Sequence, residues 1–222
     1  MKKRICLPFL FLATALAHAD DIDDSLFYEY HNRIAVFSPY HITYERIKTD
    51  AFYTGVEGWL VGSLTGDADV IGDAELRMGY NLFWNQRDHF TPFAGVGFFK
   101  DFSRVHTRHW KCDEYDYCHF HRSRHHIPGV IYGTVGFLYD HEFNDVFNLG
   151  FNAKGLAGGP VSTKFVDWGS PVFGLDVALP ITFRFGYRRH WDARLEPFNL
   201  YMHGEQFDRN YFGFRSTVGY RF

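Results

Sequence analysis

The chain ends in the segment FGFRSTVGYRF (212–222), and this segment decides the fold class. Counted back from the last residue, every second position carries Phe222, Tyr220, Val218, Ser216, Phe214 and Phe212. The positions between them carry Arg, Thr and Gly. Alternation with period two predicts a β-strand with one apolar and one polar face. Most chains end in a frayed polar tail, so a strand that ends on an aromatic residue indicates a structural role for the terminus.

The same alternation recurs through most of the chain. It predicts eight strands, bounded by turn residues, at 51–62, 71–84, 91–101, 128–140, 145–155, 171–180, 189–202 and 209–222. The segment 38–48 also has strand character, which leaves ten strands as the alternative. Residues 20–50 open with the acidic run DDIDD, and we expect residues 20–37 to be a loosely held tail.

The first 19 residues have the pattern of a secretory signal peptide. Three basic residues precede a block of 13 apolar residues, and Ala17 and Ala19 stand where a signal peptidase cleaves. The block is shorter than the roughly 20 residues of a membrane-spanning helix. Removal of this peptide would leave 20 basic and 26 acidic residues, a balance that argues against nucleic acid as a partner.

The composition favours a barrel in a membrane over one in water. Aromatic residues make up 20% of the chain, with 25 Phe and 14 Tyr. Outer-membrane barrels carry such rings on the face that meets lipid, with girdles at both interfaces. A soluble sandwich or lipocalin-like barrel is the alternative, but its outward face would be rich in Lys and Glu. We therefore expect residues 51–222 to form an all-β, transmembrane, antiparallel up-and-down β-barrel.

The lengths of the connections agree with this topology. In outer-membrane barrels the turns on the periplasmic side are short and the external loops are longer. Counted from the last strand, the turns at 85–90, 141–144 and 181–188 fall on the periplasmic side. The connections at 63–70, 102–127, 156–170 and 203–208 fall outside, and 102–127 is the longest of them.

Charged residues occupy the polar face of the predicted strands. If the apolar face meets lipid, five acids and five bases lie inside the barrel: Glu57, Glu75, Arg77, Lys154, Asp176, Asp192, Arg194, Glu196, Arg215 and Arg221. The bore of an eight-stranded barrel is just wide enough for side chains to fill, and unpaired buried charges are costly. We favour an ion-paired plug over a narrow ion path. Ten strands would shift this balance toward a pore.

The external loop 102–127 contains both cysteines of the predicted mature chain and six histidines. Outside the cytoplasm a close cysteine pair usually oxidises, so we expect a Cys112–Cys118 disulfide that stabilises the fold by roughly 2–3 kcal/mol. A metal site at Cys118, His119 and His121 is the weaker alternative, since the spacing matches no recognised zinc pattern. We expect no cofactor. The loop is basic, so lipopolysaccharide phosphates are candidate partners.

The last strand resembles the assembly signal of Gram-negative outer-membrane β-barrels. The residues that carry the resemblance are Phe214, Val218, Tyr220 and the terminal Phe222, and Ser216 departs from it. The signal peptide and the strand pattern are similar to small barrels of the OmpA-type superfamily. This resemblance implies an outer-membrane location, contact with outer-membrane lipid, and reading of the last strand by the barrel-assembly machinery.

Three functions remain open at this point. The first is a structural or surface-interaction role through the basic, His-rich loop. The second is a narrow, porin-like channel for ions or small solutes. The third is a lipid-modifying enzyme, which we do not expect, because no G-x-S-x-G elbow occurs and no catalytic residue is indicated.

Overall fold

A computed structural model describes the chain from Tyr30 to Phe222, with internal gaps. The described residues are 30–37, 40–62, 64, 70–84, 87–102, 104–112, 118–126, 128–161, 170–204 and 207–222. The signal peptide expected at 1–19, with its cleavage site at Ala17 and Ala19, lies outside them. Among the described residues, no helix is long and apolar enough to cross a membrane.

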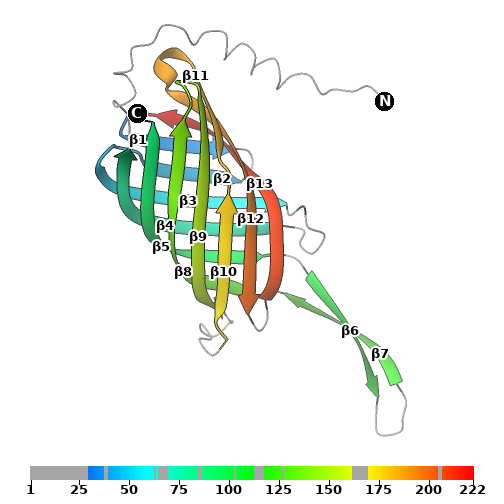
Figure 1. The fold of residues 1–222 in the computed structure, drawn as a ribbon. Helices are drawn as coiled ribbons and strands as arrows, with labels where there is room; N and C mark the ends of the chain where they lie inside the picture. Colours follow the sequence, from blue (N-terminus) through cyan, green and yellow to red (C-terminus); the bar gives the residue numbers. More distant parts are fainter. Residues whose placement is uncertain are drawn as a thin grey trace, which may run out of the picture.

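Within the described chain, eleven strands form one antiparallel sheet that closes on itself (Figure 1). The strands are β1 (Asn32–Phe37), β2 (His41–Arg46), β3 (Ala51–Gly62), β4 (Val70–Trp84), β5 (Asp88–Asp101), β8 (Gly129–Glu142), β9 (Phe147–Val161), β10 (Val172–Ala178), β11 (Ile181–Phe185), β12 (Trp191–Gly204) and β13 (Phe207–Arg221). Strands that follow one another in the chain pair with each other, apart from β10 and β11 and from the hairpin inserted after β5. The pairing of β1 with β13 completes the ring.

Two of these strands share one place in the ring. Both β10 and β11 lie between β9 and β12, and only Leu179 and Pro180 separate them. Proline has no N–H to donate to the ladder, which explains the interruption. The described barrel therefore has ten strand positions.

Of the two strand counts that the sequence leaves open, the described barrel has ten positions, the alternative, and not the favoured eight. Each of the eight predicted segments contains a barrel strand, and the additional positions are β1 and β2, of six residues each. The segment 38–48 supplies β2. Residues 32–37, expected within a loosely held tail, form β1 and close the barrel. The predicted turn at 181–188 is also shorter than expected, because β11 continues the preceding strand to Phe185.

The last residue of the chain lies in the closing seam. The Phe222 N–H donates to the Asn32 carbonyl at 3.0 Å, and the Phe222 carbonyl accepts the N–H groups of His31 and Asn32 at 3.0 and 2.9 Å. Above this, Ile34 is opposite Tyr220 and Val36 is opposite Val218. The terminal strand is thus held on both edges, by β12 and by β1.

The two ends of the barrel differ. Tyr30 and Phe222 lie at one end, here called the terminal end, together with the short turns at 47–50, 143–146 and 186–190. The opposite end, here called the hairpin end, is where β6 (Arg104–Cys112) and β7 (Cys118–His126) extend away from the barrel as a separate two-stranded sheet (Figure 1).

The side chains are arranged inside-out relative to a water-soluble protein. Successive strand residues point to opposite faces, and here the outward face is apolar. Val135 is 68% exposed and Met78 63%, whereas inward-facing Lys154 and Glu75 are 6% and 3% exposed. Large apolar side chains are exposed on every barrel strand, far beyond the scattered ones that soluble surfaces carry.

Candidate functional site in the barrel interior

The barrel interior has two zones. The charged zone fills the middle and the terminal end, where inward-facing acidic and basic side chains from most strands meet. The apolar zone fills the hairpin end and consists of Trp59, Ile71, Phe99, Val130, Tyr132, Leu156, Val172, Ala178, Phe198, Leu200, Met202 and Tyr211.

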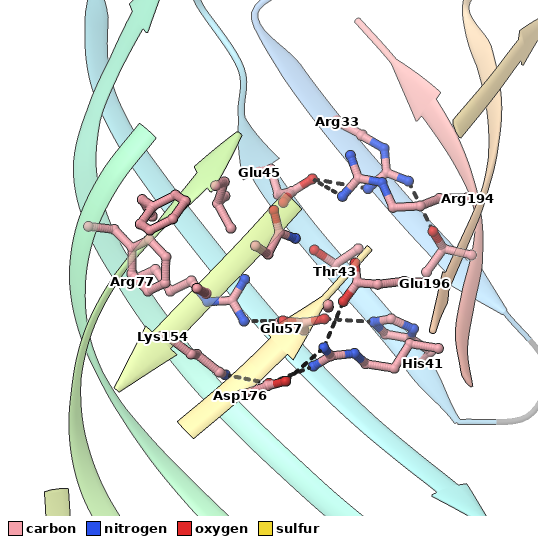
Figure 2. A pocket seen from close by; sticks show the side chains of 18 residues that line it. Arg33, His41, Thr43, Glu45, Glu57, Arg77, Lys154, Asp176, Arg194 and Glu196 are labelled. Carbon is pink, nitrogen blue, oxygen red and sulfur yellow. Dashed lines mark hydrogen bonds and ion pairs between the residues drawn. The ribbon is translucent and has the colours of Figure 1, made fainter. Parts of the chain in front are cut away.

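Lys154 stands at the centre of the charged zone and faces three carboxylates. Its Nζ pairs with Glu75 and lies 3.6 Å from a carboxylate oxygen of Asp73. It lies at the same distance from a carboxylate oxygen of Asp176 (Figure 2). These acids come from β4 and β10, so one ammonium group links three strands across the bore. Arg77 continues the network, because its guanidinium pairs with Glu57 and, at 2.8 Å, with Glu75.

Arg215 joins the charged zone to the apolar zone. Its guanidinium lies 3.1 Å from Asp176 and 2.8 Å from Glu196. The same group lies over the rings of Phe198 and Trp59, 4.4 and 5.4 Å from their centroids. A cation over an aromatic face is attracted by the ring quadrupole, so Arg215 is held by both zones.

Arg33 holds the closing seam from inside. It donates to Asp192 at 2.7 Å, to Glu45 at 3.0 Å and to Thr217 at 3.0 Å. One side chain of β1 thereby contacts β2, β12 and β13. Arg221 also donates to Asp192, at 3.1 Å, so this fully buried carboxylate receives two guanidinium groups.

The terminal end contains two small cavities of about 80 and 70 Å³. Both are lined by His89, Asp140 and Arg194. Nearby, Arg184 pairs with Glu142, which also lies 3.3 Å from His89. The cavity between the charged side chains in the middle of the barrel is smaller, about 30 Å³, which is room for one or two waters.

Two buried acids accept hydrogen bonds from tyrosines of the apolar zone. The Tyr132 hydroxyl donates to Asp73 at 2.6 Å, and the Tyr211 hydroxyl donates to Asp101 at 2.9 Å. Tyr132 and Tyr211 are two of the twelve side chains of the apolar zone, which pack together inside the barrel. The axis is therefore filled by packed apolar groups at the hairpin end and by ion pairs in the middle.

The structure places all ten predicted interior charges in the charged zone and joins each to an oppositely charged group. The sequence reasoning missed five further members: Arg33, Glu45, Asp73, Glu142 and Arg184. Arg33 and Glu45 belong to the two strands that were not assigned. Arg184 fell in a predicted turn. The alternation of Arg33 and Ala35 with Ile34 and Val36 was the signal for β1, but it covers only six residues.

The other predicted residues lie outside this site. Phe214, Val218, Tyr220 and Phe222 all face outward and are 36–52% exposed. In the β6–β7 hairpin, the register sets Cys112 directly opposite Cys118. Side-chain chemistry at these cysteines, and at His119 and His121, lies outside the described part of the structure. Among the described residues, no group of three or more His, Cys, Asp or Glu could hold a metal ion.

Comparison with known proteins does not extend this description. No protein-family model, no curated protein and no solved structure matches the chain.

Proposed function

We propose that the chain is an outer-membrane barrel, closed along its axis, that has a structural or surface-interaction role and carries the β6–β7 hairpin outside. The inside-out arrangement of side chains supports the membrane location, because exposed apolar side chains on every barrel strand gain free energy in lipid. The network of ion pairs inside removes the cost of unpaired buried charges.

Strand lengths and aromatic residues support the same location. Strands β4, β9 and β13 have 15 residues each, more than the roughly 9–11 that a tilted strand needs to cross a bilayer. At the terminal end, Tyr220 stacks with His190 and Phe222 and contacts Trp191. Such rings are typical of the interface between lipid and water.

The apolar zone carries the proposal of a closed barrel. A water-filled path needs a polar lining, and this zone offers twelve packed side chains in its place. A narrow channel is the second candidate, and the cavities at the terminal end favour it. They end below the apolar zone, so conduction would require this zone to move.

The β6–β7 hairpin is the proposed contact surface. It extends from the hairpin end, opposite the end that holds Tyr30 and Phe222 (Figure 1). This would place the hairpin outside the cell if the terminal end faces the periplasm. Its sequence carries Arg104, Arg108, Lys111, Arg122 and Arg124 with six histidines. Anionic phosphates such as those of lipopolysaccharide are the partners that this composition favours.

Planar-bilayer recording distinguishes the closed barrel from the channel. We expect purified, folded protein to add no discrete current steps to the bilayer baseline. A matched variant that lacks residues 103–127 should also stay at baseline, since the hairpin is not part of the barrel sheet. The full-length protein should bind vesicles that display lipopolysaccharide, and the shortened variant should lose this binding. Discrete steps from the full-length protein would establish the channel instead.

A further inference from the structure

The β6–β7 hairpin has two faces of different composition, and the register of its strands defines them. Residues directly opposite each other in an antiparallel ladder share a face, and every second residue along each strand returns to that face. One face, here called the arginine face, includes Cys112 and Cys118. It also holds every arginine of β6 and β7: Arg104, Arg108, Arg122 and Arg124.

The other face, here called the histidine face, holds histidines at neighbouring positions. His109 is paired with His121, and the next pair on this face is Lys111 with His119. Residues opposite each other in such a ladder lie about 5 Å apart, and diagonal neighbours lie about 7–8 Å apart. Histidines therefore occupy three of the four positions in two successive pairs, and Lys111 occupies the fourth.

Three histidines at this spacing fit the ligand chemistry of a transition-metal ion. Imidazole nitrogen is a ligand for Zn²⁺, Cu²⁺ and Ni²⁺, and three protein ligands with one water complete a tetrahedral zinc site. Arginines repel a cation, and those of the two strands belong to the opposite face. Among the residues of β6 and β7 on the histidine face, Lys111 is the one Lys or Arg.

The histidine face is separate from the charged zone of the barrel. The hairpin forms its own two-stranded sheet, which extends away from the barrel (Figure 1). Among the described side chains of the barrel, no group of three or more His, Cys, Asp or Glu could hold a metal ion. A metal bound by the hairpin would therefore leave the ion pairs of the interior unchanged.

We propose that His109, His119 and His121 bind one divalent transition-metal ion, for which Zn²⁺ is the probe. This ligand set differs from the alternative of Cys118 with His119 and His121, because the register sets Cys118 on the arginine face. The proposal goes beyond the proposed function. It does not depend on the membrane location or on contact between the arginine face and phosphates.

Isothermal titration calorimetry of the full-length protein tests the site. The protein is folded in detergent, without reducing agent and without an affinity tag. We expect one Zn²⁺ per chain, and no binding of Mg²⁺, which prefers oxygen ligands. His109→Asn and His121→Asn should each weaken Zn²⁺ binding at least tenfold, since loss of a group that only supports a metal ligand already costs about 10–100-fold.

Two histidines of the arginine face supply the matched control. His106 and His126 belong to the same two strands, where they are opposite Arg124 and Arg104. The double variant His106→Asn, His126→Asn should bind Zn²⁺ as the wild type does. All of these variants should keep the gel migration of a folded barrel, because the hairpin is not part of the barrel sheet.

Three results would overturn the site. The first is a wild type that binds no Zn²⁺. The second is an equal loss of binding in His109→Asn and in the control, which would show that dispersed histidines take up the ion. The third is a loss in Cys112→Ser, Cys118→Ser while His109→Asn binds normally, which would assign the ion to the set with Cys118. Protein that binds Zn²⁺ but does not insert into vesicles would contradict the proposed location and support the site.

Discussion

Replacing Arg33 by Met is expected to destabilise the barrel by about 3–5 kcal/mol, the usual cost of removing one partner of a buried ion pair. The Arg33 side chain is 1% exposed and donates to Asp192, Glu45 and Thr217. Methionine fills similar volume but leaves Asp192, which is 0% exposed, with Arg221 as its remaining cation in the charged zone. Because β1 is short and closes the ring, the variant should open at the β1–β13 seam.

Urea titration of the folded barrel, followed by the migration difference between unboiled and boiled protein on a detergent gel, measures this loss. Arg87→Met, at an exposed residue in a turn, is the matched control and should change stability by less than about 0.5 kcal/mol. Arg33→Lys should recover part of the loss, since it keeps the charge but not the fork of donors. An Arg33→Met variant as stable as the control would show that the seam does not depend on this side chain.

Lys154→Met is expected to destabilise the barrel by a similar amount, about 3–5 kcal/mol, for a different reason. It leaves Asp73, Glu75 and Asp176 close together without the cation that separates them. Arg77 and Arg215 still contact two of these acids, so the added cost comes from repulsion among buried carboxylates. The seam is intact in this variant, and unfolding should therefore stay cooperative.

The same urea titration measures this variant beside Lys48→Met, an identical substitution at an exposed turn residue. A second variant, Lys154→Met with Asp73→Asn, removes one of the three acids and should restore part of the stability. If Lys154→Met matches Lys48→Met, the carboxylates are neutral or hydrated, and the ion-paired plug is wrong.

Much of this architecture could be predicted because a barrel strand has a strict period of two. Long strands such as β4 and β13 repeat the pattern over 15 residues, which fixes which charges face inward. The six residues of β1 repeat the pattern only three times. So short an alternation cannot be distinguished from an irregular N-terminal segment. These residues pair with β13, at the far end of the chain. A pairing over that separation leaves no local pattern in the sequence.

The division of the interior into two zones was not predictable for a related reason. Alternation shows that Trp59 and Glu57 both point inward. Which side chains of other strands lie at the same height along the barrel axis depends on the stagger between strands. The outward face also depends on this stagger, since Gly58, Ala74 and Phe98 become neighbours through the register. Differences in side-chain size along a row that crosses several strands cannot be predicted from the sequence without the register.

The central claim, that the apolar outward face meets lipid, is tested most directly by a spin label at Val135. This residue lies in the middle of β8 and is 68% exposed. In a Cys112→Ser, Cys118→Ser background, Val135→Cys is labelled and the folded protein is placed in phospholipid vesicles. The account predicts that oxygen dissolved in lipid relaxes the label strongly while a water-soluble nickel chelate does not, with the reverse at a Lys48→Cys control. A Val135 label that the chelate reaches as readily as the Lys48 label would contradict it.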